Sequence, residues 1–154
     1  TAQDGGRFAD GSADVVMNGW RFHMPDLAAA VGRVQLARFE SELKPARLAL
    51  VRQYREQLAG ARAVQPLPGN DDCVSHIMAV RVQAALRAEL RARLAAAGYE
   101  TRVHYRPGHT LSAFADASAF PGADQLFSEV LSLPLHAGVT ALDVDAITAV
   151  CRAL

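Results

Sequence analysis

The sequence predicts a mixed α/β fold in which a long helical segment leads into a small, mainly antiparallel sheet backed by helices. Apolar residues recur at helical spacing through residues 26–60. Short apolar runs then alternate with amphipathic stretches through residues 61–154. The chain has 154 residues, of which 51% are hydrophobic and 21% charged, and this composition suits a folded chain with a buried core.

Three parts are predicted along the chain. Residues 1–13 are polar and rich in glycine, which predicts a flexible lead-in. Residues 14–60 are predicted to form a linking segment with a helical pair, and a short apolar run at 14–17 indicates the end of a strand. Residues 61–154 are predicted to form a small α/β domain.

Two consecutive helices are predicted in the linking segment. The first covers residues 26–43, and Pro25 suits its first turn because a proline ring already holds a helical φ. The residue before a proline is disfavoured in a helix, so Lys44-Pro45 predicts a break or a kink. The second helix is then expected over residues 45–60, where a glycine ends it.

The small domain is predicted as short strands that alternate with helices. A loop with a short helix is expected over residues 107–119, and Thr140 with Asp143 matches a capping box that opens the last helix. Strands are expected over 63–67, 77–82, 99–105 and 131–135, and helices over 84–97, 123–131 and 140–154.

Charge and cysteine content exclude several classes of protein. Sixteen basic residues balance sixteen acidic ones, so the chain lacks the electrostatic footprint of a protein that binds nucleic acid or an anionic membrane. No apolar run approaches the roughly 20 residues of a membrane span. Cys73 and Cys151 make no disulfide framework, and a cytoplasmic location is expected.

The densest cluster of chemically useful residues is TRVHYRPGH, at residues 101–109. In an extended strand, Arg102 and His104 point to one side and Tyr105 to the other. Polar and titratable side chains at a strand end before Pro-Gly favour a binding site over a core strand. His104 and His109 could also suggest a metal, but no third ligand is evident. A solvated loop without a role is the remaining interpretation.

A second cluster, WRFHM at residues 20–24, precedes the first long helix. The start of that helix offers unpaired N–H groups, and together with Arg21 it suits a phosphate group. The alternative is a hydrophobic staple in which the apolar residues pack while Arg21 and His23 face water. Spacing alone leaves both interpretations open.

Four isolated histidine and cysteine residues carry weaker signals. His76 precedes a predicted strand and His136 follows one, so each is expected to be structural. A nucleophile made of Cys73 and His76 lacks a supporting residue. Cys151 lies inside the last predicted helix and is expected in the core.

Four segments in order, at residues 19–32, 75–82, 101–109 and 131–140, carry a family resemblance. The first is similar to Gly-x-Asn-x-Arg-Met-x-(Asp/Glu)-x-x-Ala-Ala-x-Gly, the third to Thr-Arg-x-His-Tyr-x-Pro-x-His, and the fourth to Leu-Ser-Leu-Pro-Leu. These consensus patterns are typical of the DegT/DnrJ/EryC1/StrS family of pyridoxal 5'-phosphate (PLP)-dependent sugar aminotransferases, and the chain resembles this family over residues 14–154. The resemblance implies the C-terminal small domain of a type I PLP-dependent aminotransferase fold, with a long linking helix.

The resemblance also implies a function. The chain would be the C-terminal portion of an aminotransferase that acts on a nucleotide-linked keto sugar, with an amino acid such as glutamate as donor. The implied partners are an N-terminal half that carries PLP on a lysine and a second copy in a homodimer. Lys44, the one lysine of the chain, sits at a predicted helix break rather than in the buried site that such a lysine needs. The chain alone is therefore expected to be inactive, and the alternative is a short, non-catalytic binding module.

Five site residues follow from the resemblance. The family's asparagine, which reaches the cofactor phosphate of the neighbouring subunit, falls on Arg21, and an arginine side chain can still bind phosphate bidentately. The family's arginine near the sugar falls on His23, a shorter donor that titrates near neutral pH. His104 and Tyr105 match residues that face the sugar, and His109 lies nearer the mouth of the site. No catalytic residue and no metal ligand is implied on this chain.

Overall fold

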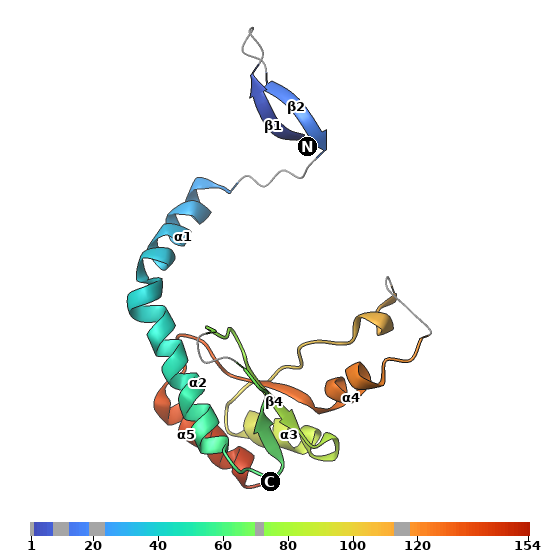
Figure 1. Ribbon diagram of the computed structural model, residues 1–154. Helices are drawn as coiled ribbons and strands as arrows, with labels where there is room; N and C mark the ends of the chain where they lie inside the picture. Colours follow the sequence, from blue (N-terminus) through green and yellow to red (C-terminus); the bar gives the residue numbers. More distant parts are fainter. Residues whose placement is uncertain (1, 8–12, 19–23, 70–72, 113–117) are drawn as a thin grey trace. The chain divides into compact units, whose positions relative to one another are not determined.

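The described structure covers most of the chain. The computed structural model describes residues 2–7, 13–18, 24–69, 73–112 and 118–154. The chain divides into two units, Thr1–Phe39 and Glu40–Leu154. The predicted mixed α/β fold with a small antiparallel sheet is confirmed (Figure 1).

The first unit begins with a β-hairpin. Strand β1 (Ala2–Arg7) pairs antiparallel with strand β2 (Ala13–Asn18), and the apolar run predicted to end a strand lies inside β2. The flexible lead-in predicted over residues 1–13 is therefore replaced by a strand over most of its first half. Pairing with β2 satisfies backbone N–H and C=O groups, and glycine-rich composition does not reveal such pairing.

At Lys44-Pro45, where a break or a kink is predicted, the chain stays helical but its regular α-helical pattern is interrupted just before this point. Helix α1 (Asp26–Arg38) is followed by a π-helical stretch (Phe39–Leu43), and helix α2 (Lys44–Leu58) begins directly after it. A proline inside a regular helix removes one backbone hydrogen bond and crowds the preceding turn. The π-helical stretch lies at this position, and its different hydrogen-bond pattern accommodates Pro45 in the first turn of α2.

A three-stranded antiparallel sheet forms the centre of the second unit. Its order is β3 (Val64–Pro66), β4 (Met78–Val82) and β5 (Val130–Leu133), so β4 is central. Each strand overlaps the range that the sequence predicts, and β5 begins one residue earlier than expected. Both faces of β5 are buried, because all four of its residues are shielded from solvent.

Three further helices belong to the second unit. They are α3 (Arg87–Ala96), α4 (Pro121–Glu129) and α5 (Ala141–Arg152), each within or close to its predicted range. A 3-10 turn precedes α3, and another, Gly108–Thr110, lies in the predicted loop. Of the helices that the structure describes, none is both long enough and apolar enough to cross a membrane.

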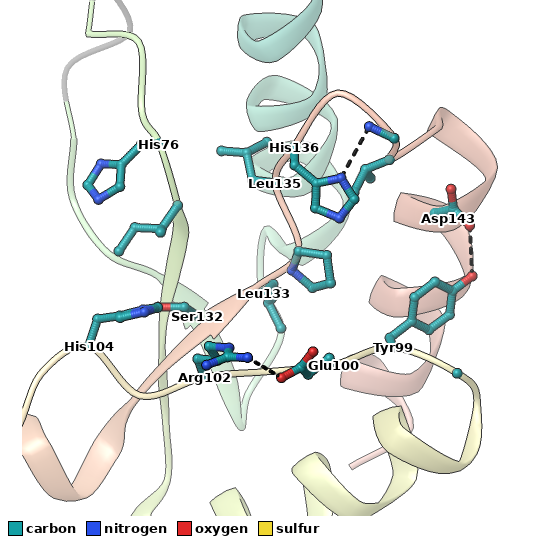
Figure 2. Close-up of a pocket in the computed structure, with 15 residues that line it drawn as sticks. His76, Tyr99, Glu100, Arg102, His104, Ser132, Leu133, Leu135, His136 and Asp143 are labelled. Atoms are coloured by element: carbon teal, nitrogen blue, oxygen red, sulfur yellow. Dashed lines mark hydrogen bonds and ion pairs between the residues drawn. The ribbon is translucent and has the colours of Figure 1, made fainter. Parts of the chain in front are cut away.

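The strand predicted over residues 99–105 is wrong except at one position. Arg102 alone pairs with Ser132 of β5, through Ser132 N to Arg102 O at 2.7 Å and Arg102 N to Ser132 O at 3.2 Å (Figure 2). The end of α3 provides the reason. Gly98 has a φ of +87°, and Tyr99 N donates back to a carbonyl of the last helical turn at 2.8 Å. The start of the segment thus closes a helix and does not extend the sheet.

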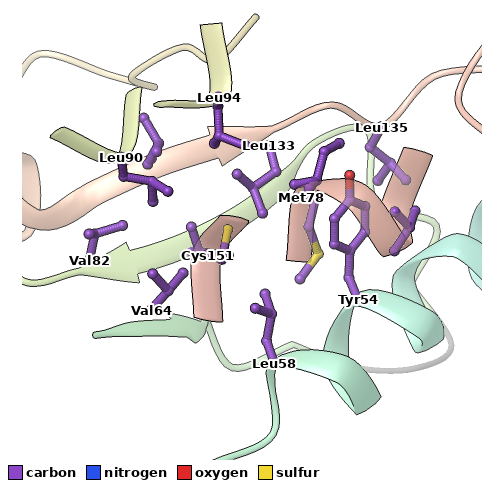
Figure 3. Packing of buried hydrophobic residues seen from close by; sticks show 14 of the residues in the cluster. Tyr54, Leu58, Val64, Met78, Val82, Leu90, Leu94, Leu133, Leu135 and Cys151 are labelled. Carbon is purple, nitrogen blue, oxygen red and sulfur yellow. The ribbon is translucent and has the colours of Figure 1, made fainter. Parts of the chain in front are cut away.

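The core of the second unit lies between the sheet and the helices α2, α3 and α5 (Figure 3). Tyr54 and Leu58 of α2, Leu131 of β5 and Ile147 of α5 are each at most 1% exposed. Because α2 supplies part of this core, it belongs with the sheet, whereas the sequence grouped it with the linking segment over residues 14–60. The core fixes β4 and β5, and polar residues that flank these strands form the cleft described next.

Candidate functional site

A cleft of about 490 Å³ opens where β4 begins and β5 ends (Figure 2). One wall comes from the residues that precede β4, a second from the segment after α3, and a third from β5 with the loop that follows it. Leu133 and Leu135 contribute apolar surface. The polar side chains that matter below are His76, Glu100, Arg102, His104, Ser132 and His136.

His104 is the predicted substrate residue that lines this cleft. Its ring is half-buried, and its Nδ1 lies 2.9 Å from the Oγ of Ser132, a serine that is only 5% exposed. Tyr105 packs edge-on against the His104 ring, with centroids 4.7 Å apart, and is 72% exposed. The two predicted residues are therefore adjacent, one held in the cleft wall and the other projecting into solvent.

His109 is not brought into the cleft. Its Nε2 lies 3.0 Å from Asp124 Oδ1 on α4, and its ring stacks on Phe120 at 4.8 Å between centroids. These contacts leave the His109 side chain 15% exposed and tie the loop after His104 to α4. The other two predicted residues, Arg21 and His23, lie outside the described residues.

The predicted capping box at the start of α5 is confirmed, and it forms one side of the cleft. Asp143 Oδ2 accepts from Thr140 N at 2.8 Å and from Thr140 Oγ1 at 2.7 Å, and Tyr99 OH donates to Asp143 Oδ1 at 3.1 Å. The hydrogen bonds from Thr140 lower the pKa of Asp143, and Tyr99 and His136 lower it further. Burial raises the pKa of Tyr99, and the hydrogen bond to Asp143 raises it further.

Sequence reasoning missed four residues of the cleft. His76 and His136 were expected to be structural, and Glu100 and Ser132 were given no role. His136 Nδ1 accepts from the backbone N–H of Gly138 at 3.1 Å. The positions of the two histidines were the one signal that could have indicated a shared site. His76 lies just before β4 and His136 lies just after β5, and these two strands pair with each other.

Neither Lys44 nor Cys151 has the surroundings of a reactive nucleophile. Lys44 Nζ lies 2.8 Å from Glu40 Oε2, and the lysine side chain is 37% exposed. Cys151 is buried, which raises the pKa of its thiol to about 12, so it is not a ready nucleophile. Within the ranges that the structure describes, no three His, Cys, Asp or Glu side chains gather as a metal site would require.

The sequence profile of the DegT/DnrJ/EryC1/StrS aminotransferase family matches residues 4–152. Three solved structures are similar to the chain. TlmJ, an aminotransferase from Streptoalloteichus hindustanus, is 28% identical over 92% of this chain and 39% of that protein, with a TM-score of 0.77. CalS13, a sugar aminotransferase from Micromonospora echinospora, is 25% identical over 94% of this chain and 39% of that protein, with a TM-score of 0.81.

The third similar structure is Spr1654, a proposed sugar aminotransferase from Streptococcus pneumoniae, solved in a PLP form and a PMP form. The PMP form is 28% identical over 92% of this chain and 38% of that protein, with a TM-score of 0.80. The chain thus spans 38% to 39% of the length of these three proteins. These likenesses confirm that its fold is part of an aminotransferase fold.

Proposed function

The chain belongs to the DegT/DnrJ/EryC1/StrS aminotransferase family, and from this premise we propose that it is the C-terminal portion of a PLP-dependent aminotransferase acting on a nucleotide-linked keto sugar. An amino acid such as glutamate is the proposed amino donor. One observation carries the proposal: the family match over residues 4–152 includes a cleft whose wall holds His104 in a fixed hydrogen bond.

In this proposal the chain supplies walls of the substrate site. His104 and Tyr105 meet the sugar, and their edge-to-face contact gives the pair a defined geometry. His23 also faces the sugar, and His109 lies nearer the mouth. Arg21 binds the cofactor phosphate of the neighbouring subunit in a homodimer.

The residues of this chain do not fit the role of covalent anchor for PLP. An imine-forming lysine is normally desolvated, so that its pKa falls and the neutral amine can react. Lys44 is instead partly exposed, with 37% of its side chain accessible, and paired with Glu40. PLP, when bound to the complete protein, supplies the electron sink for amino transfer. The lysine that holds it belongs to the proposed N-terminal half, and this chain alone is inactive.

Helix α1 supplies the proposed contact with that half. Leu27 is 80% exposed and Val31 57% exposed, and α1 buries none of its residues in the described structure. Large exposed apolar side chains on one helix mark a surface that another part of the protein covers. The chain spans 38% to 39% of similar proteins, so the upstream polypeptide is the proposed occupant. The free thiols of Cys73 and Cys151 suit the reducing cytoplasm that we propose as its location.

The first test is an immunoblot of source-cell extract with an antibody raised against this chain. A band at more than twice 16.5 kDa is expected, and the complete polypeptide should then show PLP absorbance and aminate a nucleotide-linked keto sugar in the presence of glutamate. A band only at 16.5 kDa would favour the non-catalytic binding module. PLP absorbance without amination would reject the proposed reaction.

A second test addresses Lys44 directly. The chain is incubated with PLP, reduced with borohydride, and analysed by mass spectrometry beside the variant Lys44→Arg. We expect at most trace labelling of Lys44, as for any exposed lysine. Stoichiometric labelling that Lys44→Arg abolishes would show that the chain carries its own cofactor lysine.

A further inference from the structure

We propose that the cleft is an oxyanion subsite, in which His104, His136 and Arg102 donate hydrogen bonds to a carboxylate or phosphate group. The proposal deepens the proposed function and rests on it for the source of the ligand, because an amino-acid donor carries carboxylates and a nucleotide-linked sugar carries phosphates.

The tautomer of His136 is set by the backbone. The N–H of Gly138 donates to His136 Nδ1 at 3.1 Å, and a backbone N–H can only donate. Nδ1 is therefore the acceptor, and the proton of the neutral ring lies on Nε2. His136 is exposed and lines the cleft, so it presents a hydrogen-bond donor there without needing a positive charge.

The tautomer of His104 is set by a buried serine. Ser132 is 5% exposed and its Oγ lies 2.9 Å from His104 Nδ1. A buried hydroxyl needs an acceptor for its proton, and in the described part of the chain every buried polar side-chain atom has a partner. Donation from Ser132 to Nδ1 meets this need and leaves the proton of His104 on Nε2. Both histidines thus use Nδ1 internally and keep Nε2–H for a ligand.

Arg102 adds a positive charge to the cleft, and its guanidinium group is already paired with the carboxylate of Glu100. The Arg102 guanidinium lies 2.7 Å from Glu100 Oε1, with 69% and 76% of the two side chains exposed. Such an exposed pair is weak, so an incoming oxyanion can replace Glu100. The second acid of the cleft, Asp143, already accepts hydrogen bonds from Thr140 and Tyr99.

The test is a titration of the 154-residue chain, labelled with ¹⁵N, with inorganic phosphate and separately with glutarate at constant ionic strength. The imidazole ¹⁵N shifts of His104 and His136 report both the tautomers and the dissociation constant. We expect Nε2–H tautomers and saturable shifts at both rings. Arg102→Gln should weaken binding about tenfold, because a charge-assisted hydrogen bond is lost. Glu100→Gln should strengthen it, since the competing carboxylate is removed.

The matched control is Arg91→Gln, which removes an exposed arginine of α3 that does not line the cleft. This variant should leave the dissociation constant unchanged. Glu100→Gln guards against misfolding, because a damaged fold cannot produce a gain in affinity. Saturation by phosphate alone would assign the subsite to a phosphate group, and saturation by glutarate alone would assign it to a carboxylate.

Three results would overturn the proposal. These are the absence of saturable shifts with both probes, equal weakening by Arg91→Gln and Arg102→Gln, and a proton on Nδ1 of His136. The titration needs neither PLP nor turnover. If the chain binds oxyanions but the complete protein does not transaminate, the subsite stands and the proposed function is rejected. If the complete protein transaminates but the chain does not bind oxyanions, the proposed function stands and the subsite is rejected.

Discussion

Helices α1 and α2 follow one another in the chain, yet their surroundings are opposite. Helix α1 has 13 residues and buries none of them, whereas α2 has 15 residues and buries Val51, Tyr54 and Leu58. The residues that α2 buries follow helical spacing on one side, facing the sheet and α5. Both helices form, so a helical backbone alone does not show whether the partner of a helix lies in the same chain.

The distribution of apolar residues explains the difference. In α1, Leu27, Val31 and Val34 lie on one side, while Leu36 lies on the opposite side of the same helix. All four are more than half exposed. A helix that is apolar on more than one side is suited to burial between several elements. The comparison therefore separates a region that completes its own core from one whose apolar side chains stay exposed among the described residues.

The largest expected effect is on the complete core. Leu131→Ala removes a fully buried side chain from β5 and should lower the free energy of unfolding by about 3 kcal/mol, measured by urea denaturation. The matched control is Leu142→Ala in α5, because Leu142 is 78% exposed. That control should change the free energy of unfolding by less than about 0.5 kcal/mol. Equal losses would mean that the second unit does not have the core described.

A smaller effect is expected at the helix cap beside the cleft. Thr140→Ala removes the side chain that accepts from Asp143 N and should lower the free energy of unfolding by about 1 kcal/mol. Thr140→Ser keeps the hydroxyl and serves as the control. A loss in Thr140→Ser as large as in Thr140→Ala would show that the hydroxyl is not responsible.

The same cap predicts a pH dependence. The folded-state pKa of Asp143 lies below the ordinary value of 3.8, mainly because Thr140 donates to the carboxylate. Its stabilising contribution is therefore present above pH 3.8 and is lost as the pH falls through the lower, folded-state pKa. In Thr140→Ala the decline in stability below pH 3.8 should be shallower, which acid titration followed by circular dichroism can measure.

The smallest effect on stability is expected in α1. Leu27→Ala combined with Val31→Ala should leave the free energy of unfolding of the second unit within about 0.5 kcal/mol, because neither residue is buried. The same variant should reduce self-association of the chain in sedimentation velocity, since it shortens the exposed apolar side chains. Leu142→Ala is again the control and should not reduce self-association. A loss of stability near that of Leu131→Ala would place α1 in the core.

Local signals predicted most of the elements. The capping box at Thr140, the glycine just after α2 and the helical spacing of α2 each depend on residues a few positions apart, and each is confirmed. Long-range pairing was the weak point. The segment over residues 99–105 has the composition of a strand, but only Arg102 finds a partner in β5.

In the candidate site, too, a local motif could be predicted from the sequence, whereas residues brought together by long-range pairing could not. His104 was identified from its motif, and the structure places it in the cleft. His76 and His136 are 60 positions apart (136 − 76), and no spacing rule connects them. They line one cleft because β4 pairs with β5, which brings the start of one strand beside the end of the other.

The sequence by itself determined most of the element types, the family and the one motif histidine, because these depend on neighbouring residues and on their order. Only the tertiary structure decided that Pro45 is accommodated within a helix, that His109 contacts α4, and that three chain segments enclose one cleft. The physical reason is that hydrogen bonds and packing between distant segments outweigh local preference wherever the two compete.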